Sequence, residues 1–327
     1  MTSLYPLKFR PILKDKIWGG NKIKSELNKD FAPLPNCGES WEISGVPGNI
    51  SVVAEGALAG KSLEELIRTY QGRLLGDRIY HQHRHQFPLL IKFIDANDDL
   101  SIQVHPDDEL AMKRHDSLGK TEMWYVVKSD PGAKIITGFN QSVDRKEFRK
   151  YFENDQLMEI LNEEDASAGD VFYIPAGRVH TLGKGNLIAE IQQTSDVTYR
   201  IFDFNRVDDQ GNSRDLHVEE ALDAMDYQVY DDYKTKYVPI KNEVSPLVKS
   251  RYFETSLLYL DQPLSRNYDL LDSFKILICI EGSFNLMYEG KSFHFGLGDS
   301  VLVPAEISSL EIQPVDTVKI IETYIPQ

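Results

Sequence analysis

The chain is organised around the stretch Gly169-Asp170-Val171-Phe172-Tyr173-Ile174-Pro175-Ala176-Gly177-Arg178-Val179-His180, in which a short apolar run leads into a turn and a histidine. Proline presets φ and glycine adopts conformations that other residues avoid, so Pro175 and Gly177 define a tight turn between two strands. The turn directs His180 toward the interior of a sheet. Taken alone, His180 is equally compatible with a structural histidine in a buried hairpin.

The composition is typical of a soluble globular protein with a full-sized core. Of the 327 residues, 41% are hydrophobic and 27% are charged, and this length favours two globular units. The net charge of −15 argues against a nucleic-acid partner, because phosphate backbones require clustered lysine and arginine. No apolar run approaches the roughly 18 residues of a membrane span, so we expect no membrane partner either.

The cysteine usage and the N-terminus bear on the compartment. Cys37 and Cys279 are the only cysteines and lie far apart in the sequence, which does not suggest a disulfide framework. Residues 1–6 carry no basic-then-apolar signal for secretion. We therefore expect a cytoplasmic protein.

Helical patterns interrupt a chain that otherwise alternates strands and turns. Capping-box spacing and apolar periodicity predict helical insertions at about 61–76 and 141–163, and periodicity alone predicts another at about 217–225. A further short helix is expected over 107–115. The polar segment 81–85 contains three alternate histidines, and we interpret it as a solvated connector rather than a metal site.

An internal repeat relates the two ends of the chain. Residues 298–305 match residues 169–176 in register, since glycine, aspartate, proline and alanine recur. Counting on from the proline, Ser309 stands where His180 stands, and Lys275 is expected roughly where Glu122 lies. The repeat predicts two related barrels of which only the first retains side chains that bind metals.

Four such side chains are candidates for one centre: Gln103, His105, Glu122 and His180. Gln103 and His105 are two residues apart on a predicted strand, so their side chains point to the same face. Imidazole and carboxylate donors suit Zn²⁺, Fe²⁺ or Mn²⁺, and the absence of thiolates excludes a closed cysteine-type structural zinc site. Such a set keeps room for a substrate, as catalytic sites require.

The pattern Gly-x5-Pro-x-Gly-x2-His resembles the second motif of the cupin superfamily, whose β-barrel binds a metal through that histidine. The resemblance implies a mainly β fold with inserted helices, built from two cupin-type jelly-roll barrels. Residues 1–240 would form the catalytic barrel and residues 241–327 a degenerate barrel without metal ligands. The sequence departs from the broad cupin pattern, because it has Gln-x-His with Glu122 well downstream, and Lys184 in place of the usual final asparagine. Both departures weaken a metal-oxygenase interpretation.

Several motifs together resemble the type I mannose-6-phosphate isomerases in their short bacterial form, over essentially the whole chain. They are Ser101-Ile102-Gln103-Val104-His105-Pro106-Asp107-Asp108, Gly119-Lys120-Thr121-Glu122, the stretch 169–180, and Glu190-Ile191-Gln192-Gln193-Thr194-Ser195-Asp196-Val197-Thr198-Tyr199-Arg200. The resemblance implies one Zn²⁺ per chain, bound by Gln103, His105, Glu122 and His180. It also implies an active-site arginine, Arg200, with Lys120, Glu190, Ser101 and Lys92 lining the same pocket.

The implied reaction interconverts mannose 6-phosphate and fructose 6-phosphate through an enediol. Glu190 is the leading candidate for the proton shuttle, because a carboxylate in a partly dry interior can have its pKa raised toward the working range. A structural role beside Arg200 is an equal alternative, and Lys120 competes as the base. Two other functions stay open: a cupin-type metal oxygenase and a non-catalytic sugar-binding cupin.

Overall fold

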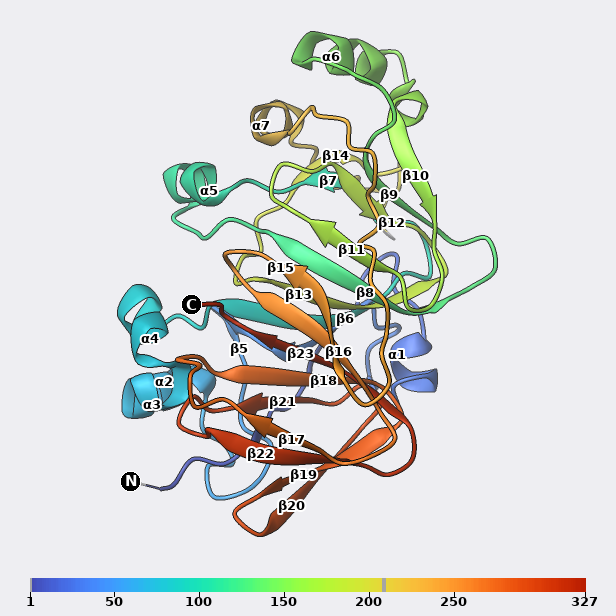
Figure 1. Cartoon of the computed structure of the whole chain (residues 1–327). Coiled ribbons are helices and arrows are strands. Elements are labelled where there is room, and N and C mark those ends of the chain that lie inside the picture. Colours follow the sequence, from blue (N-terminus) through green and yellow to red (C-terminus); the bar gives the residue numbers. More distant parts are fainter. Residues whose placement is uncertain (1, 208–209) are drawn as a thin grey trace. The chain divides into compact units, whose positions relative to one another are not determined.

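The computed structural model describes residues 2–207 and 210–327, and these form two compact units (Figure 1). Unit 1 combines the described residues up to Ile12 with Trp41–Lys92 and Lys236–Gln327, and unit 2 combines Leu13–Ser40 with Phe93–Thr235. The units interleave along the chain, whereas the sequence predicts a boundary at residue 240. That domain division stays a prediction.

Unit 2 contains two sheets built from short strands. One has the strand order β10-β9-β12-β7-β14, and the other contains β11, β8 and β13 as neighbours. The bounds are β7 Ile102–Val104, β8 Glu122–Ser129, β9 Lys134–Phe139, β10 Leu161–Asp165, β11 Val171–Ile174, β12 His180–Leu182, β13 Asn186–Gln193 and β14 Tyr199–Phe202. The chain passes from one unit to the other within β2 (Ile12–Lys14), β3 (Glu39–Ile43) and β6 (Leu89–Asp95).

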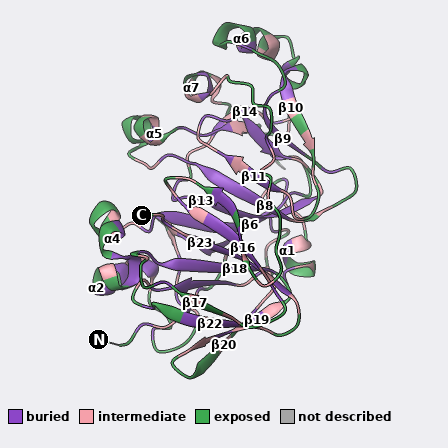
Figure 2. Cartoon of the chain, in the orientation of Figure 1, coloured by how far each residue is buried: buried purple, intermediate pink, exposed green. Residues whose placement is uncertain are grey.

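The two sheets of unit 2 face one another across an apolar layer. Ile135 and Leu182 from the first sheet cluster with Trp124, Phe172 and Ile174 from the second, and all five are buried. The opposite face of the first sheet packs against the helices of this unit. Most strands are accordingly buried, while the helices keep exposed faces (Figure 2).

Unit 1 has the same mainly β character. Its larger sheet has the order β1-β21-β18-β23-β16-β15, its smaller sheet the order β17-β22-β19-β20, and β4 pairs with β5. The bounds are β1 Leu7–Lys8, β4 Gly45–Val46, β5 Asn49–Ile50, β15 Val244–Lys249, β16 Glu254–Leu260, β17 Leu264–Asn267, β18 Lys275–Glu281, β19 Ser283–Tyr288, β20 Lys291–Gly296, β21 Ser300–Val303, β22 Ser309–Pro314 and β23 Val318–Tyr324.

The prediction of two barrels fails in one respect, which is closure of the sheets. Among residues 2–207 and 210–327, every sheet ends on two different edge strands, so none closes on itself by hydrogen bonding. The mainly β class with inserted helices is confirmed. The physical reason for the difference is that apolar packing between two facing sheets buries the core without a continuous ring of strands.

The predicted helical insertions are present, except that the end of the segment 141–163 is wrong: Leu161–Asp165 form strand β10, which pairs with β9. They contain α2 (Leu63–Tyr70) and α3 (Gly72–Leu75), then α6 (Arg145–Glu153) with a 3₁₀ turn at Leu157–Glu159, and α7 (Val218–Ala224); α5 (Asp108–His115) is the further short helix. Both expected capping boxes form. In one of them the Asp144 side chain accepts from the backbone N–H of Glu147, and the Glu147 side chain accepts from that of Asp144.

The histidine-rich segment differs from the expected connector. Residues Asp77–His83 form a helix, α4, and a short helix α1 spans Lys22–Ser25. The cap of α4 comes from a distant residue, because the Asp272 carboxylate accepts from the backbone N–H groups of Asp77 and Arg78 at 2.7 and 2.9 Å. A cap supplied through tertiary structure leaves no local signal in the sequence.

The strand registers confirm the internal repeat. In unit 2, Glu122 of β8 lies opposite Ile174 of β11, and in unit 1 Lys275 of β18 lies opposite Val303 of β21. Ile174 and Val303 are matching positions of the repeat. Lys275 therefore takes the place of Glu122, as predicted, and the unit 1 centre carries a lysine where unit 2 has a candidate ligand.

Two further observations concern the chain as a whole. In the part of the chain that the structure describes, no helix combines the length and the apolar character needed to cross a membrane. Cys37 and Cys279 are both buried free thiols.

Candidate metal centre

Cross-strand pairing brings the candidate residues of the first sheet into one row. His180 of β12 lies opposite Gln103 of β7, and Gln103 lies opposite Arg200 of β14. Residues directly opposite each other share one face of a sheet. The tight turn at Gly177, where φ is +89°, sets the start of β12 and so the position of His180 in this row.

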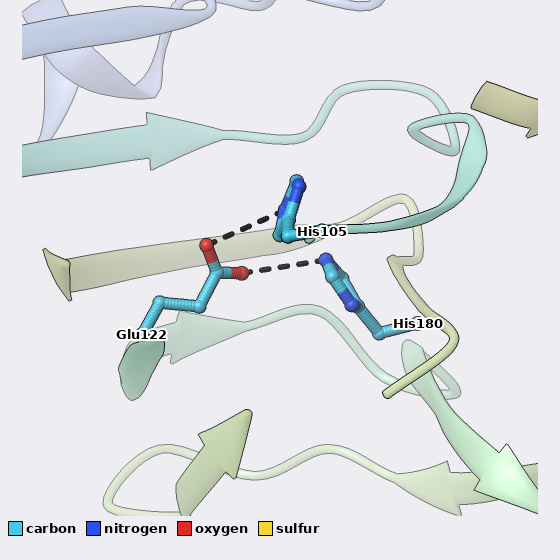
Figure 3. A group of neighbouring side chains, drawn as sticks. All are labelled: His105, Glu122 and His180. Carbon is cyan, nitrogen blue, oxygen red and sulfur yellow. Dashed lines mark ion pairs between the residues drawn. The ribbon is translucent and has the colours of Figure 1, made fainter. Parts of the chain in front are cut away.

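Three ionisable side chains converge at this place (Figure 3). The Nε2 atom of His180 is 3.3 Å from Oε1 of Glu122, and Nε2 of His105 is 3.6 Å from Oε2 of the same carboxylate. One ligand atom from each side chain lies within 4.8 Å of the others, and all three residues are buried. Glu122 reaches the cluster from strand β8 of the facing sheet.

Backbone carbonyls orient both imidazoles. The Nδ1 atom of His105 lies 3.0 Å from the carbonyl oxygen of Val197, and Nδ1 of His180 lies 2.9 Å from that of Arg178. A carbonyl only accepts hydrogen bonds, so each Nδ1 carries a proton, and each Nε2 faces the Glu122 carboxylate. Burial lowers the pKa of His180 to about 3, and a neutral imidazole is the form that binds metals.

The predicted amide ligand lies beside this cluster. Nε2 of Gln103 is 3.3 Å from Nε2 of His180, and Oε1 of Gln103 accepts a hydrogen bond from the Ser101 hydroxyl at 3.4 Å. A half-turn of the amide plane exchanges these two atoms. Gln103 is thus in reach of the centre, and Ser101 lines the same place, while the ligand role of Gln103 stays a prediction.

Lys120 is also part of the cluster. Its ammonium is 3.1 Å from Nε2 of His105 and 3.5 Å from Oε2 of Glu122, and the residue is buried. The sequence places Lys120 near the centre through the family resemblance and through its short distance from Glu122 along the chain. The structure therefore brings together His105, Glu122, His180, Gln103 and Lys120.

Glu190 is buried on β13, where it lies opposite Trp124 of β8. Its Oε2 accepts a hydrogen bond of 2.8 Å from the indole Nε1 of Trp124, and the Trp124 ring meets the His180 ring edge-on at 5.4 Å. Glu190 and the candidate partner Arg200 belong to strands of different sheets. Sequence reasoning missed Trp124, which is an ordinary apolar position in its strand pattern.

Arg200 stands at the end of the row, on the edge strand β14. One of its terminal nitrogens, Nη1, donates to the carbonyl oxygen of Asp215 at 2.8 Å, and within the described residues Nε has no hydrogen-bond partner. Burial, followed by the nearby Arg214, lowers the pKa of Arg200. An arginine stays charged through such a shift, so Arg200 supplies a partly desolvated cation for an anionic ligand.

Lys92 is the one predicted pocket residue that belongs to unit 1. It is buried on β6, and its ammonium lies 5.1 Å from the centre of the Trp41 ring. Its role in the pocket stays a prediction.

The donor set fits a metal ion. Two imidazole nitrogens and a carboxylate oxygen are the ligands of catalytic zinc sites, in which a further position is left for water or substrate. Both imidazoles are already oriented by the carbonyl groups of Val197 and Arg178, which is the outer-shell arrangement that metal-bound histidines require. Fold and donor chemistry together define a mainly β protein with a candidate metal centre of the catalytic type.

Comparison with known proteins identifies the family. The model for the type I phosphomannose isomerase catalytic domain matches residues 6–131, and that for the mannose-6-phosphate isomerase cupin domain matches residues 243–325. Together these matches cover more than half of the chain, so it belongs to the type I phosphomannose isomerase family.

Individual proteins similar to this chain carry the name of the same family. The mannose-6-phosphate isomerase of Streptococcus mutans is 42% identical over 220 residues, 67% of each chain. Mannose-6-phosphate isomerase ManA of Bacillus subtilis is 32% identical over 94% of this chain and 96% of its own. The crystal structure of the mannose 6-phosphate isomerase from Bacillus subtilis superposes with a TM-score of 0.88, covering 97% of this chain and 99% of that one.

Proposed function

We propose that this chain is a zinc-dependent aldose–ketose isomerase that interconverts mannose 6-phosphate and fructose 6-phosphate. The observation that carries the proposal is the buried convergence of His105, Glu122 and His180 in a chain of this family. One Zn²⁺ per chain would be held by these three residues and by Gln103. When bound, it would act as a Lewis acid that polarises the carbonyl and hydroxyl oxygens of the sugar.

The chain's own residues then move one proton between neighbouring carbons. The carboxylate of Glu190 takes the proton from C2 of mannose 6-phosphate and returns it to C1, while a hydroxyl proton passes between the two oxygens. The indole of Trp124, 2.8 Å from Oε2, holds this carboxylate in place. Lys120 is the competing base, and its position beside His105 and Glu122 supports that alternative.

Cationic side chains would balance the negative charge of the sugar phosphate. A chain with a net charge of −15 repels an anion at long range, so binding requires a local positive site. Arg200 can direct two parallel hydrogen bonds to phosphate or enediolate oxygens. Lys120 contributes a second cation, and Ser101 and Lys92 complete the proposed set.

The finer architecture belongs to the same proposal. We propose that the facing sheets of each unit correspond to a cupin-type jelly roll, with the catalytic part within residues 1–240 and a metal-free part within 241–327. The repeat and its register, with Lys275 in the place of Glu122, support this division of roles. Two free, buried cysteines support a cytoplasmic location.

A coupled assay for fructose 6-phosphate formed from mannose 6-phosphate, together with metal analysis of the purified protein, tests the function. We expect His180→Ala to lose zinc and activity together. Arg200→Ala is expected to keep its zinc and to lose about 100-fold or more in rate, the typical effect of removing one preorganised charge-stabilising group. An Arg200→Ala enzyme with near-normal turnover would contradict the role of this residue.

The same preparation separates the two alternatives. A cupin oxygenase would contain iron and consume oxygen, and a sugar-binding cupin would bind mannose 6-phosphate without converting it. Arg149→Ala serves as the control, because Arg149 is a half-buried helix residue that pairs with Glu219 outside the proposed site. It is expected to keep both zinc and activity.

A further inference from the structure

The row of candidate residues across the first sheet of unit 2 has a fourth member. Thr137 of β9 lies directly opposite His180 of β12, on the side away from Gln103, which is itself opposite Arg200. The order across four neighbouring strands is therefore Thr137, His180, Gln103 and Arg200. Directly opposed residues project from the same face of a sheet.

That face is the interior one. Two residues farther along the same two strands, Leu182 lies opposite Ile135. Ile135 and Leu182 pack against Trp124 in the apolar layer between the two sheets. Because side chains two apart on a strand share a face, Thr137 and His180 also project into this interior.

The hydroxyl of Thr137 is buried without a partner. The residue is 0% exposed, and within residues 2–207 and 210–327 its Oγ1 makes no hydrogen bond. A buried hydroxyl is costly unless it is hydrogen-bonded, and such exceptions call for a partner that the protein itself does not supply. An apolar valine would fill nearly the same volume, so packing alone does not account for threonine here.

We propose that Thr137 is a substrate-binding residue that hydrogen-bonds a hydroxyl group of the sugar phosphate. This inference rests on the proposed function, and it adds a contact that the ligand set and the arginine do not provide. A threonine hydroxyl both donates and accepts, as a sugar hydroxyl does, whereas it carries no charge for a phosphate. The anion is left to Arg200 at the opposite end of the row.

The test compares Thr137→Val with the unchanged protein, both loaded with zinc. Titration calorimetry measures the Kd for the hexitol phosphate obtained by reducing mannose 6-phosphate, which has no carbonyl to isomerise. We expect Thr137→Val to bind this probe about three- to tenfold more weakly, the change that corresponds to one neutral hydrogen bond. Zinc content is expected to stay at one per chain, and thermal stability to stay level or rise.

Deoxy analogues of the probe identify the contact. With the analogue that lacks the contacted hydroxyl, Thr137→Val and the unchanged protein should bind equally, since the hydrogen bond is then absent from both. Thr137→Ser keeps a hydroxyl and is expected to recover most of the affinity that valine loses. Thr181→Val is the matched control, because the Thr181 hydroxyl donates to the carbonyl oxygen of Leu100 at 2.7 Å and should affect stability rather than Kd.

The outcomes separate this inference from the proposed function. Equal Kd values for Thr137→Val and the unchanged protein would overturn it and would leave a buried water as the partner of the hydroxyl. If the unchanged protein binds the probe but does not convert mannose 6-phosphate, the proposed reaction fails while the Kd comparison still decides the role of Thr137.

Discussion

Replacement of Trp124 by phenylalanine tests the proton shuttle most directly. The substitution keeps an aromatic side chain in the apolar layer and removes the indole N–H that donates to Glu190 at 2.8 Å. That hydrogen bond holds the Glu190 carboxylate in one orientation. Without it, the carboxylate that receives the proton from the sugar is no longer fixed in the reacting geometry, and misplacement of a reacting group lowers the rate.

The size of the effect follows from the type of bond. A neutral donor to a buried carboxylate contributes about 1.5–3 kcal/mol, and about 1.4 kcal/mol corresponds to a factor of ten in rate. The value of kcat/KM should therefore fall by roughly 10- to 100-fold. The fall is expected mainly in kcat, because the lost contact positions a reacting group and does not itself bind the substrate.

The assay measures kcat and KM for mannose 6-phosphate separately, under the same conditions for each variant. Trp18→Phe is the control, since Trp18 is buried in the same apolar cluster as Trp124 and loses a similar volume. It should lower stability to a similar extent and leave kcat and KM unchanged. Zinc content of both variants is determined in parallel.

One result would refute the reasoning. If Trp124→Phe retains zinc and the kcat of the unchanged enzyme, the hydrogen bond from Trp124 does not position a reacting base, and Glu190 is not the proton shuttle. Lys120 would then be the better candidate for the base, and its replacement by methionine would be expected to remove turnover without removing zinc.

Three further predictions concern charge and metal. Glu122→Gln should weaken zinc binding by more than about tenfold, since even the loss of an outer-shell partner costs that much. Metal analysis measures the zinc content, and Glu163→Gln at an exposed position is the control. Zinc at a free concentration about a thousandfold above its Kd should raise the unfolding free energy of unit 2 by about 4 kcal/mol. Hydrogen exchange measures this gain, and it should show no gain in protection in unit 1, where Lys275 stands in place of the ligand Glu122. Glu322→Gln should destabilise unit 1 by about 3–5 kcal/mol, because the buried carboxylate of Glu322 accepts hydrogen bonds from Arg266 and from the Tyr268 hydroxyl. Chemical denaturation measures this loss, and Glu281→Gln at an exposed position is the control.

The register of unit 1 also shows what a repeat in sequence can miss. Glu322 of β23 lies opposite Leu277 of β18, and Glu190 of β13 lies opposite Trp124 of β8, at matching positions of the repeat. The degenerate unit has therefore kept a buried carboxylate at the position of Glu190. The match is invisible in the sequence, because the segments before the two glutamates differ in length.

Local sequence determined the features that depend on neighbouring residues. Two-residue spacing placed Gln103 and His105 on one face of a strand, the proline–glycine turn set the start of the strand that carries His180, and the capping box at Asp144 set the start of α6. Each of these follows from backbone geometry over a few residues. The repeat extended the same reasoning to Lys275, since matching turns predict matching registers.

Only the tertiary structure decided which strands lie side by side and which groups meet across the two sheets. The hydrogen bond from Trp124 to Glu190, the cap that Asp272 gives to α4, and the buried hydroxyl of Thr137 next to His180 all join segments far apart in the chain. Long-range pairing is selected by burial of the whole apolar layer, to which no single residue contributes a recognisable pattern. The residue types that make the centre can be read from the sequence, whereas the groups that hold and complete it follow from the packing.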